Sequence, residues 1–264
     1  AEFTSEQDPR HGLVDWMQQP DNPYFARAFV NRMWGHFFSR GLVNEVDDMR
    51  ETNPPSNPEI LDYLSQEFVR SGFDMRHIVR LIATSRLYQL SSEPRPENEH
   101  DQQNFARFYA RRMIAEVLHD SVDQACGTRT NFGNMSANAR AIDLPHEGFG
   151  SYFMDTFDRP QRVSVCECER SPGATLAQVL LLGNSNDIEN KLADGKGRIA
   201  QAFEQQRPPA EMIDELYLAS LSRFPTDEER TTSLDYVQSS EDQRKATEDV
   251  LWTLLNSREF AFNR

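Results

Sequence analysis

Apolar residues recur every three or four positions in several stretches of the chain, and this periodicity predicts amphipathic helices. The first predicted helix begins at Asp21-Asn22-Pro23, a polar cap followed by proline at the first helical position, and ends at Gly41. Its apolar stripe contains Phe25, Phe29, Val30, Met33, Trp34, Phe37 and Phe38. We expect this stripe to face a core.

Two further helices are predicted before residue 90. Asn57 and Pro58 repeat the cap-plus-proline start, and the helix that they begin runs to Gly72. Asp74 then caps a third helix. Its apolar residues are Met75, Ile78, Val79, Leu81 and Ile82. We expect the three helices to pack together.

The rest of the chain is also predicted to be mostly helical. Helices are expected over residues 104–126, 175–182, 187–193 and 211–223. A capping box of Thr226 with Glu229 begins another helix, and the apolar residues of 250–255 belong to the last one.

Between residues 127 and 172 no helical period is sustained, and glycine, asparagine and proline are frequent. The predicted fold class is therefore all-α, an irregular multi-helix single domain with a long irregular loop region between its N-terminal and C-terminal helices. Residues 1–21 are interpreted as an N-terminal extension and residues 22–264 as the domain.

The composition bears on the partners that the chain can take. Its 264 residues contain 28 Lys plus Arg against 42 Asp plus Glu, a formal charge of -14. Such a charge repels a phosphate backbone, so we expect no nucleic-acid partner. No apolar run approaches the ~20 residues of a membrane helix, so no membrane span is expected.

The candidate chemistry concentrates in one acid–thiol segment, residues 155–170. It contains Asp155, Asp158, Arg159, Arg162, Cys166, Glu167, Cys168, Glu169 and Arg170. In an extended chain Cys166 and Cys168 lie on one face about 7 Å apart, at the upper limit for a disulfide. Two such thiolates also suit Zn²⁺, which needs four ligands. The remaining ligands would then be distant, from among His36, His119, His146 and Asp155.

A structural interpretation stands beside these two. The arginines of the segment pair with its carboxylates, and the cysteines fill space as small apolar side chains. Cys126 is the third cysteine, and three are too few for a disulfide scaffold. His36 and His77 fall on helices without a metal-ligand spacing, and Asp47 with Asp48 suits either a cation or the capping of turns.

Several segments carry a resemblance to a known family. They include NPYFARAFVNRMWGHFFSRGLV, SYFMDTFDRPQRVSVCECERS, TLAQVLLLGN and ELYLASLSRFPTDEE. From about Asn22 to Arg264 the chain resembles the planctomycete-type family catalogued as domain of unknown function fifteen fifty-three. The resemblance implies the C-terminal part of a larger exported protein with a cell-envelope address. It also implies companion domains in the same polypeptide, often one that is cytochrome c-like.

No catalytic template accompanies this resemblance. The chain has no Gly-x-Ser-x-Gly elbow, phosphate loop or dinucleotide fingerprint, and no Cys-x-x-Cys-His for a c-type haem. The leading hypothesis is a non-catalytic module that recognises a ligand or partner, either a glycan or a protein, within a larger exported cell-envelope protein. The alternatives are a metal-assisted hydrolase or redox protein using Cys166 and Cys168, or an electron-transfer partner of a cytochrome c-like domain.

Overall fold

The computed structural model describes residues 8–146, 148–160 and 185–263. Over these residues the chain is predominantly helical, which confirms the all-α prediction. The chain divides into two compact units, one up to residue 110 and one over residues 111–263, and each has its own hydrophobic core. Whether the two units fold as the single domain expected from the sequence stays a prediction.

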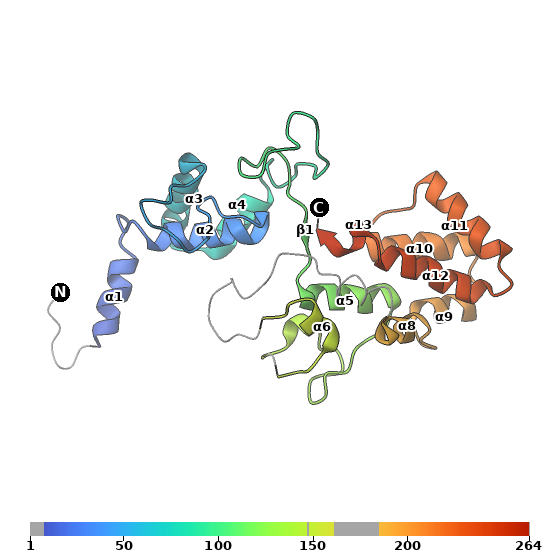
Figure 1. The fold of residues 1–264 in the computed structure, drawn as a ribbon. Coiled ribbons are helices and arrows are strands. Elements are labelled where there is room, and N and C mark those ends of the chain that lie inside the picture. The colour runs from blue at the N-terminus through green and yellow to red at the C-terminus, as the bar shows by residue number, and fades with distance from the viewer. Residues whose placement is uncertain (1–7, 147, 161–184, 264) are drawn as a thin grey trace. The chain divides into compact units, whose positions relative to one another are not determined.

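The first unit is built on three packed helices (Figure 1). Its elements are α1 (Pro9–Met17), α2 (Phe25–Phe38), α3 (Pro58–Arg70) and α4 (Met75–Ala83). Helix α2 packs on α3 and α4, and its buried Val30, Trp34 and Phe38 supply the centre of an aromatic-rich core. Asn57 and Asp74 cap α3 and α4 as predicted, because each side chain accepts backbone N–H groups of the first turn.

Helix α2 is shorter than its sequence pattern predicts. The Oδ1 of Asn22 accepts the N–H of Phe25 at 2.9 Å, and the helix begins at Phe25 rather than at the preceding proline. It ends before Ser39, which is left-handed with φ 63°. Gly41 lies beyond this end, and a Cβ there would be 2.2 Å from the carbonyl oxygen of Val43. Gly41 therefore serves a close backbone approach and does not cap the helix.

Helix α1 lies within the segment that the sequence analysis interprets as an extension. Asp8 caps it by accepting the backbone N–H of Arg10 at 3.0 Å. No residue of α1 is buried, and Leu13, Val14 and Trp16 are exposed. Without a buried face the helix leaves little apolar periodicity to detect.

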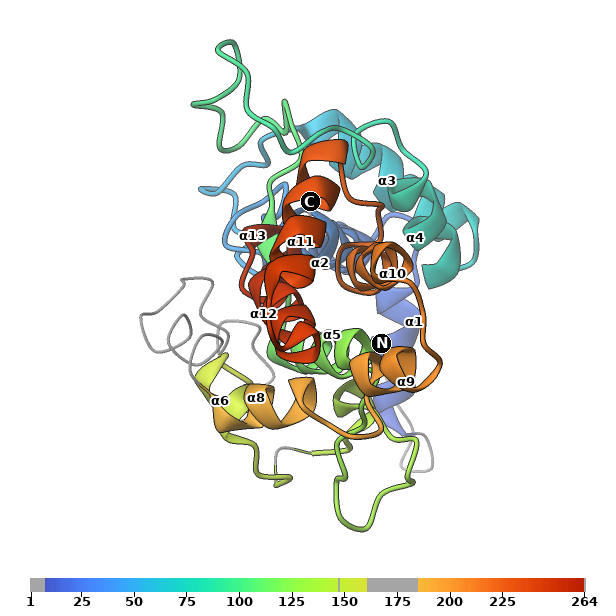
Figure 2. The same ribbon diagram turned by 90° about the vertical axis from the view of Figure 1, so that its right-hand side faces the viewer.

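The second unit contains most of the remaining helices. They are α5 (Ala115–Cys126), α6 (Tyr152–Thr156), α8 (Asn186–Leu192), α9 (Arg198–Glu204), α10 (Pro209–Leu221), α11 (Asp227–Ser239), α12 (Gln243–Leu255) and α13 (Arg258–Ala261), with a 3₁₀ turn, η1, at Ala141–Asp143. Helices α10, α11 and α12 pack against one another, and α5 packs against α6, α8 and α10 (Figure 2). The capping box of Thr226 and Glu229 begins α11 as predicted.

The helix predicted over 104–126 is wrong in its first half, because α5 begins only at Ala115. The Asp101 carboxylate accepts backbone N–H groups of residues 103, 104 and 106, and Phe105 has a φ of 57°. These local bonds hold a turn in place of the helix. Strand β1 (Arg111–Arg112) then pairs antiparallel with β2 (Phe262–Asn263), the sole sheet in the described part of the chain.

The chain between α5 and α8 is irregular as far as it is described. From residue 128 to residue 160 the described positions contain only η1 and α6 as helical elements. Ser185 caps α8 where the sequence pattern favours Asp187, and the helix predicted over 175–182 lies outside the described residues. None of the described helices has the length and apolar character needed to cross a membrane.

Candidate functional site

The described end of the acid–thiol segment forms ion pairs. The Arg159 side chain is 7% exposed, and its guanidinium donates to Asp155 Oδ1 at 2.7 Å and to the carbonyl oxygen of Phe149 at 2.6 Å. Asp158 accepts from Arg112 at 3.3 Å, and the same guanidinium lies over the Phe157 ring. At these positions the carboxylates hold guanidinium groups in place, one from Arg159 within the segment and one from Arg112 outside it.

The rest of that segment lies outside the described residues. This applies to Arg162, Cys166, Glu167, Cys168, Glu169 and Arg170. Their roles as metal ligands, disulfide or redox thiols, or ion-pair partners stay predictions. Within the described residues no group of three or more His, Cys, Asp or Glu side chains is arranged to hold a metal ion.

The other sequence candidates also have protein partners. His36 meets the Phe37 ring edge to face, His77 Nε2 lies 3.3 Å from Glu67 Oε2, and His146 packs on Phe149. Asp47 accepts from Arg32 at 2.6 Å, and Asp48 accepts from Arg50 at 2.6 Å. Each aspartate therefore fixes the loop after α2 through an arginine.

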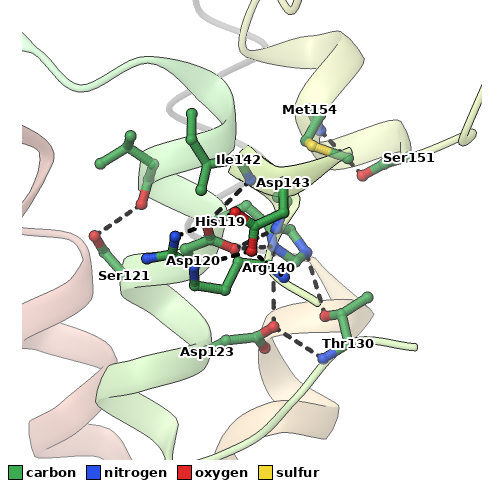
Figure 3. Close-up of polar contacts among 12 residues, drawn as sticks. His119, Asp120, Ser121, Asp123, Thr130, Arg140, Ile142, Asp143, Ser151 and Met154 are labelled. Atoms are coloured by element: carbon green, nitrogen blue, oxygen red, sulfur yellow. Dashed lines mark hydrogen bonds and ion pairs between the residues drawn. The ribbon is translucent and has the colours of Figure 1, made fainter. Parts of the chain in front are cut away.

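A buried polar cluster surrounds His119 on α5 (Figure 3). We call it the α5 cluster, and its members are His119, Asp120, Asp123, Thr130 and Lys191. His119 is 3% exposed and lies against the rings of Phe132 and Phe153. Its Nε2 is 3.3 Å from Thr130 Oγ1, and its Nδ1 is 3.9 Å from one oxygen each of Asp120 and Asp123.

The strongest link in the α5 cluster is the pair of Lys191 and Asp123. Lys191 Nζ donates to Asp123 Oδ1 at 2.5 Å and to Thr130 Oγ1 at 2.6 Å, and Asp123 Oδ2 accepts the Thr130 N–H at 2.9 Å. Burial favours the protonated form of Asp123, but the hydrogen bond and charge of Lys191 outweigh it and lower the pKa of the carboxyl. Lys191 therefore favours the ionised form of Asp123.

The α5 cluster joins three parts of the second unit. Asp120 accepts the N–H groups of Ala141 and Ile142 at 2.7 and 3.2 Å, which fixes η1 to α5. Asp123 fixes the loop at Thr130 and, through Lys191, helix α8. A hydroxyl between an imidazole and an ammonium is an arrangement found in nucleophilic sites. Here every described bond ties elements together, so the cluster positions α8.

Helix α8 forms one wall of a groove. The groove has a volume of about 630 Å³ and lies among α8, α10, α11 and α12. Three aromatic side chains line it, namely Tyr217, Tyr236 and Trp252. Its charged lining residues are Glu189, Lys245 and Asp249. This volume is typical of small-molecule sites, which combine apolar walls with a few polar groups.

The aromatic residues differ in how far they are exposed. Tyr217 is 6% exposed, whereas Trp252 is 38% and Tyr236 is 49% exposed. Burial raises the pKa of Tyr217, and a hydrogen bond with Ser233 opposes that shift. Tyr217 therefore belongs to the floor of the groove, and Trp252 and Tyr236 present partly open rings.

The polar groups of the groove are connected. Tyr236 donates its hydroxyl to Asp249 Oδ2 at 2.9 Å, a bond that raises the pKa of Tyr236. Lys245 Nζ lies 3.8 Å from Asp249 Oδ1 and 3.5 Å from Glu248 Oε2. The hydrogen bond between Tyr236 and Asp249 thus orients these two side chains before any ligand arrives, whereas Lys245 is largely exposed.

No motif in the sequence marks these groove residues. The sequence pattern places Tyr217 and Trp252 on predicted helices and does not indicate that they line a groove. One signal was available in α12, whose buried apolar residues are Val250, Leu251, Leu254 and Leu255. Trp252 falls beside that stripe rather than within it, so a helical projection of the sequence separates it from the buried face.

Comparison with known proteins identifies a family but no activity. A family model described as PSD1, protein of unknown function (DUF1553), matches residues 9–237. No curated protein and no solved structure matches the chain.

Proposed function

Because the chain belongs to the PSD1 family of unknown function (DUF1553), we propose its function from its own geometry: it is a ligand-recognition module that binds in the groove among α8, α10, α11 and α12. The single observation that carries the proposal is this groove, in which partly exposed aromatic rings meet fixed polar groups. Sites of that construction bind small organic molecules.

Buried contacts within the second unit hold helix α8, one wall of the groove, in position. Lys191 and Glu189 lie on the same short helix, α8, and the buried bonds of Lys191 to Asp123 and Thr130 set where that helix lies. Glu189 and Leu192 face the groove from this fixed element. A preorganised wall reduces the entropy lost on binding.

The proposed role is recognition without turnover. The groove residue Asp249 accepts a hydrogen bond from the Tyr236 hydroxyl and lies 3.8 Å from Lys245 Nζ. Because protein contacts engage this carboxylate, we expect a bound ligand to be released unchanged. The family resemblance supports placing the module in a larger exported cell-envelope protein beside companion domains, and cell fractionation with an antibody against the chain tests that address.

The groove is tested by a fragment screen with the full chain. Ligand-observed NMR with a library of polar ring compounds is run on the wild type, on Trp252→Ala and on Tyr152→Ala. Tyr152 is 76% exposed in the same unit and does not line the groove, so it is the matched control. We expect hits that the control retains and that Trp252→Ala loses. Hits that are indifferent to Trp252, or a complete lack of hits, would overturn the proposal.

A further inference from the structure

We infer that the ligand of the groove is a saccharide without anionic substituents. This inference rests on the proposed function, because it names the class of ligand for the same groove. It follows from three features of the described residues: the aromatic rings, the hydrogen-bonding character of the polar lining, and the sign of the charge.

The aromatic rings suit a pyranose. A sugar ring has an apolar face of C–H groups and a rim of hydroxyls, so it stacks on a flat aromatic side chain while its edge stays polar. Trp252 and Tyr236 offer such faces, since each is partly exposed and both line the groove. Tryptophan and tyrosine supply large contact areas at a low cost in side-chain entropy.

Beside donors such as Lys245, the polar lining presents several hydrogen-bond acceptors. The carboxylates of Glu189 and Asp249 only accept hydrogen bonds in their ionised form. Thr253 already donates its hydroxyl to the Asp249 backbone carbonyl at 2.9 Å, which leaves its oxygen as an acceptor. A ligand that satisfies these groups must donate hydrogen bonds. Sugar hydroxyls donate, whereas a polyproline-type peptide, the other usual occupant of aromatic grooves, offers mainly carbonyl acceptors.

The charge of the groove selects among saccharides. Two carboxylates, Glu189 and Asp249, face one ammonium, Lys245, in a chain whose formal charge is -14. A uronic acid or a sulfated sugar would bring a further negative charge into this field and pay for its desolvation. Neutral sugars avoid that repulsion, and the ammonium group of an amino sugar is attracted to the two carboxylates.

The size of the groove indicates more than one sugar ring. Its volume of about 630 Å³ lies well within the range of ~300–1,000 Å³ for small-molecule sites and exceeds the space that one pyranose fills. The rings of Trp252 and Tyr236 come from different helices, α12 and α11. They therefore suit neighbouring units of an oligosaccharide.

A glycan array with neutral, amino and uronic-acid oligosaccharides tests this inference on the full chain. The proteins compared are the wild type, Trp252→Ala, Asp249→Asn and the control Tyr152→Ala, each checked for folding by circular dichroism. The best glycan is then titrated by calorimetry at low and high salt. A proline-rich decapeptide and the ring fragments are titrated in parallel.

The expected result is binding of neutral or amino glycans by the wild type and the control. Trp252→Ala should lose at least about tenfold in affinity, or ~1.4 kcal/mol. In Asp249→Asn the ratio of the affinities for neutral and uronic-acid glycans should fall, because one negative charge is removed from the groove. The affinity of the wild type for a neutral glycan should not change with salt.

Other results separate the inference from the function that it rests on. Preference for anionic glycans, or an array on which nothing binds, overturns the saccharide inference. If the peptide or the fragments then bind in a Trp252-dependent way, ligand recognition by the groove stands and only the class is wrong. If no probe depends on Trp252, both proposals fall. Release of reducing ends from a bound glycan would show that the groove hydrolyses its ligand and would overturn recognition without turnover.

Discussion

At the scale of single residues, burial determines the role of a side chain, and Cys126 is an example. Cys126 is 2% exposed on α5, and burial raises the pKa of its thiol to about 12. Because the thiolate is the reactive form, this cysteine is inert in the folded chain. It is a filler of the core of the second unit, where it packs with residues such as Leu118 and Val122.

This burial predicts how Cys126 reacts. Iodoacetamide at pH 8 should leave the peptide that contains Cys126 unlabelled in the native chain and label it fully in guanidinium chloride. Mass spectrometry of tryptic peptides measures the difference. Rapid labelling of Cys126 under native conditions would show that the thiol is accessible and would contradict its place in the core.

At the scale of elements, one buried ion pair decides where α8 lies. Lys191 and Asp123 have side chains that are 10% and 13% exposed. Lys191→Met removes one partner and leaves a buried charge, so we expect a loss of about 3 kcal/mol in the free energy of unfolding. Urea denaturation measures it, with the exposed Lys196→Met as the control.

The double variant Asp123→Asn with Lys191→Met separates pairing from packing. If the pair acts as a unit, the double variant should lose less stability than the sum of the single changes. Additive losses would show that Lys191 and Asp123 do not depend on each other. A loss of groove binding in Lys191→Met, with the fold retained, would confirm that α8 is positioned by this pair.

The start of α11 predicts a pH dependence. Hydrogen bonds from Arg223 lower the pKa of Glu229 to about 2, because Arg223 bonds both of its carboxylate oxygens. A carboxyl whose pKa is lower in the folded chain than in the unfolded chain stabilises the fold at pH values above the unfolded pKa. This contribution is lost as the pH falls toward the folded pKa. Glu229 therefore contributes to loss of stability between about pH 4.5 and pH 2.

Glu229→Gln tests this sign. The substitution keeps the capping box with Thr226, since glutamine also serves there, and removes the charge that Arg223 needs. Thermal melts should show lower stability at pH 7 and a weaker dependence on pH between 4.5 and 2. The exposed neighbour Glu228→Gln is the control. An unchanged acid dependence in Glu229→Gln would mean that other groups govern it.

The elements also show which parts of the fold the sequence predicts. Caps such as Asn57, Asp74 and Thr226 locate helix starts because they bond backbone groups two or three residues away. In the segment before α5, the sequence pattern predicts a helix that does not form. Its apolar residues match a helical period, but the bonds of Asp101 and the pairing of Arg112 with Phe262 hold it in another conformation.

The binding site is less visible from the sequence than the helices are. Trp252 lies within an apolar run, and only the packing of α12 decides which of its faces is buried. Glu189 and Asp249 lie 60 residues apart in the chain, and no local pattern brings them together. The charges and thiols of the acid–thiol segment are neighbours in the sequence, and a sequence pattern shows such neighbours but not residues that meet only in the folded chain.

At the scale of the whole molecule, two cores predict two unfolding transitions. Asn31 is fully buried in the first unit, where its side chain bonds the N–H and carbonyl of Val43 and the carbonyl of Val46. Asn31→Ala leaves these groups unpaired, at about 2–4 kcal/mol. Scanning calorimetry should show one transition shifted by Asn31→Ala and another shifted by Lys191→Met. A single transition that both variants shift would indicate one cooperative domain.

The central claim is that the groove of the second unit is the binding face, and the indole signals of the chain test it most directly. The sequence has three tryptophans, Trp16, Trp34 and Trp252, so a ¹⁵N-labelled sample gives three indole N–H signals, and Trp252→Phe identifies one of them. On titration with the strongest glycan from the array, the Trp252 signal should move in proportion to saturation while the other two stay in place. Movement of the Trp16 or Trp34 signal instead, with Trp252 unmoved, would place the site elsewhere and contradict the account.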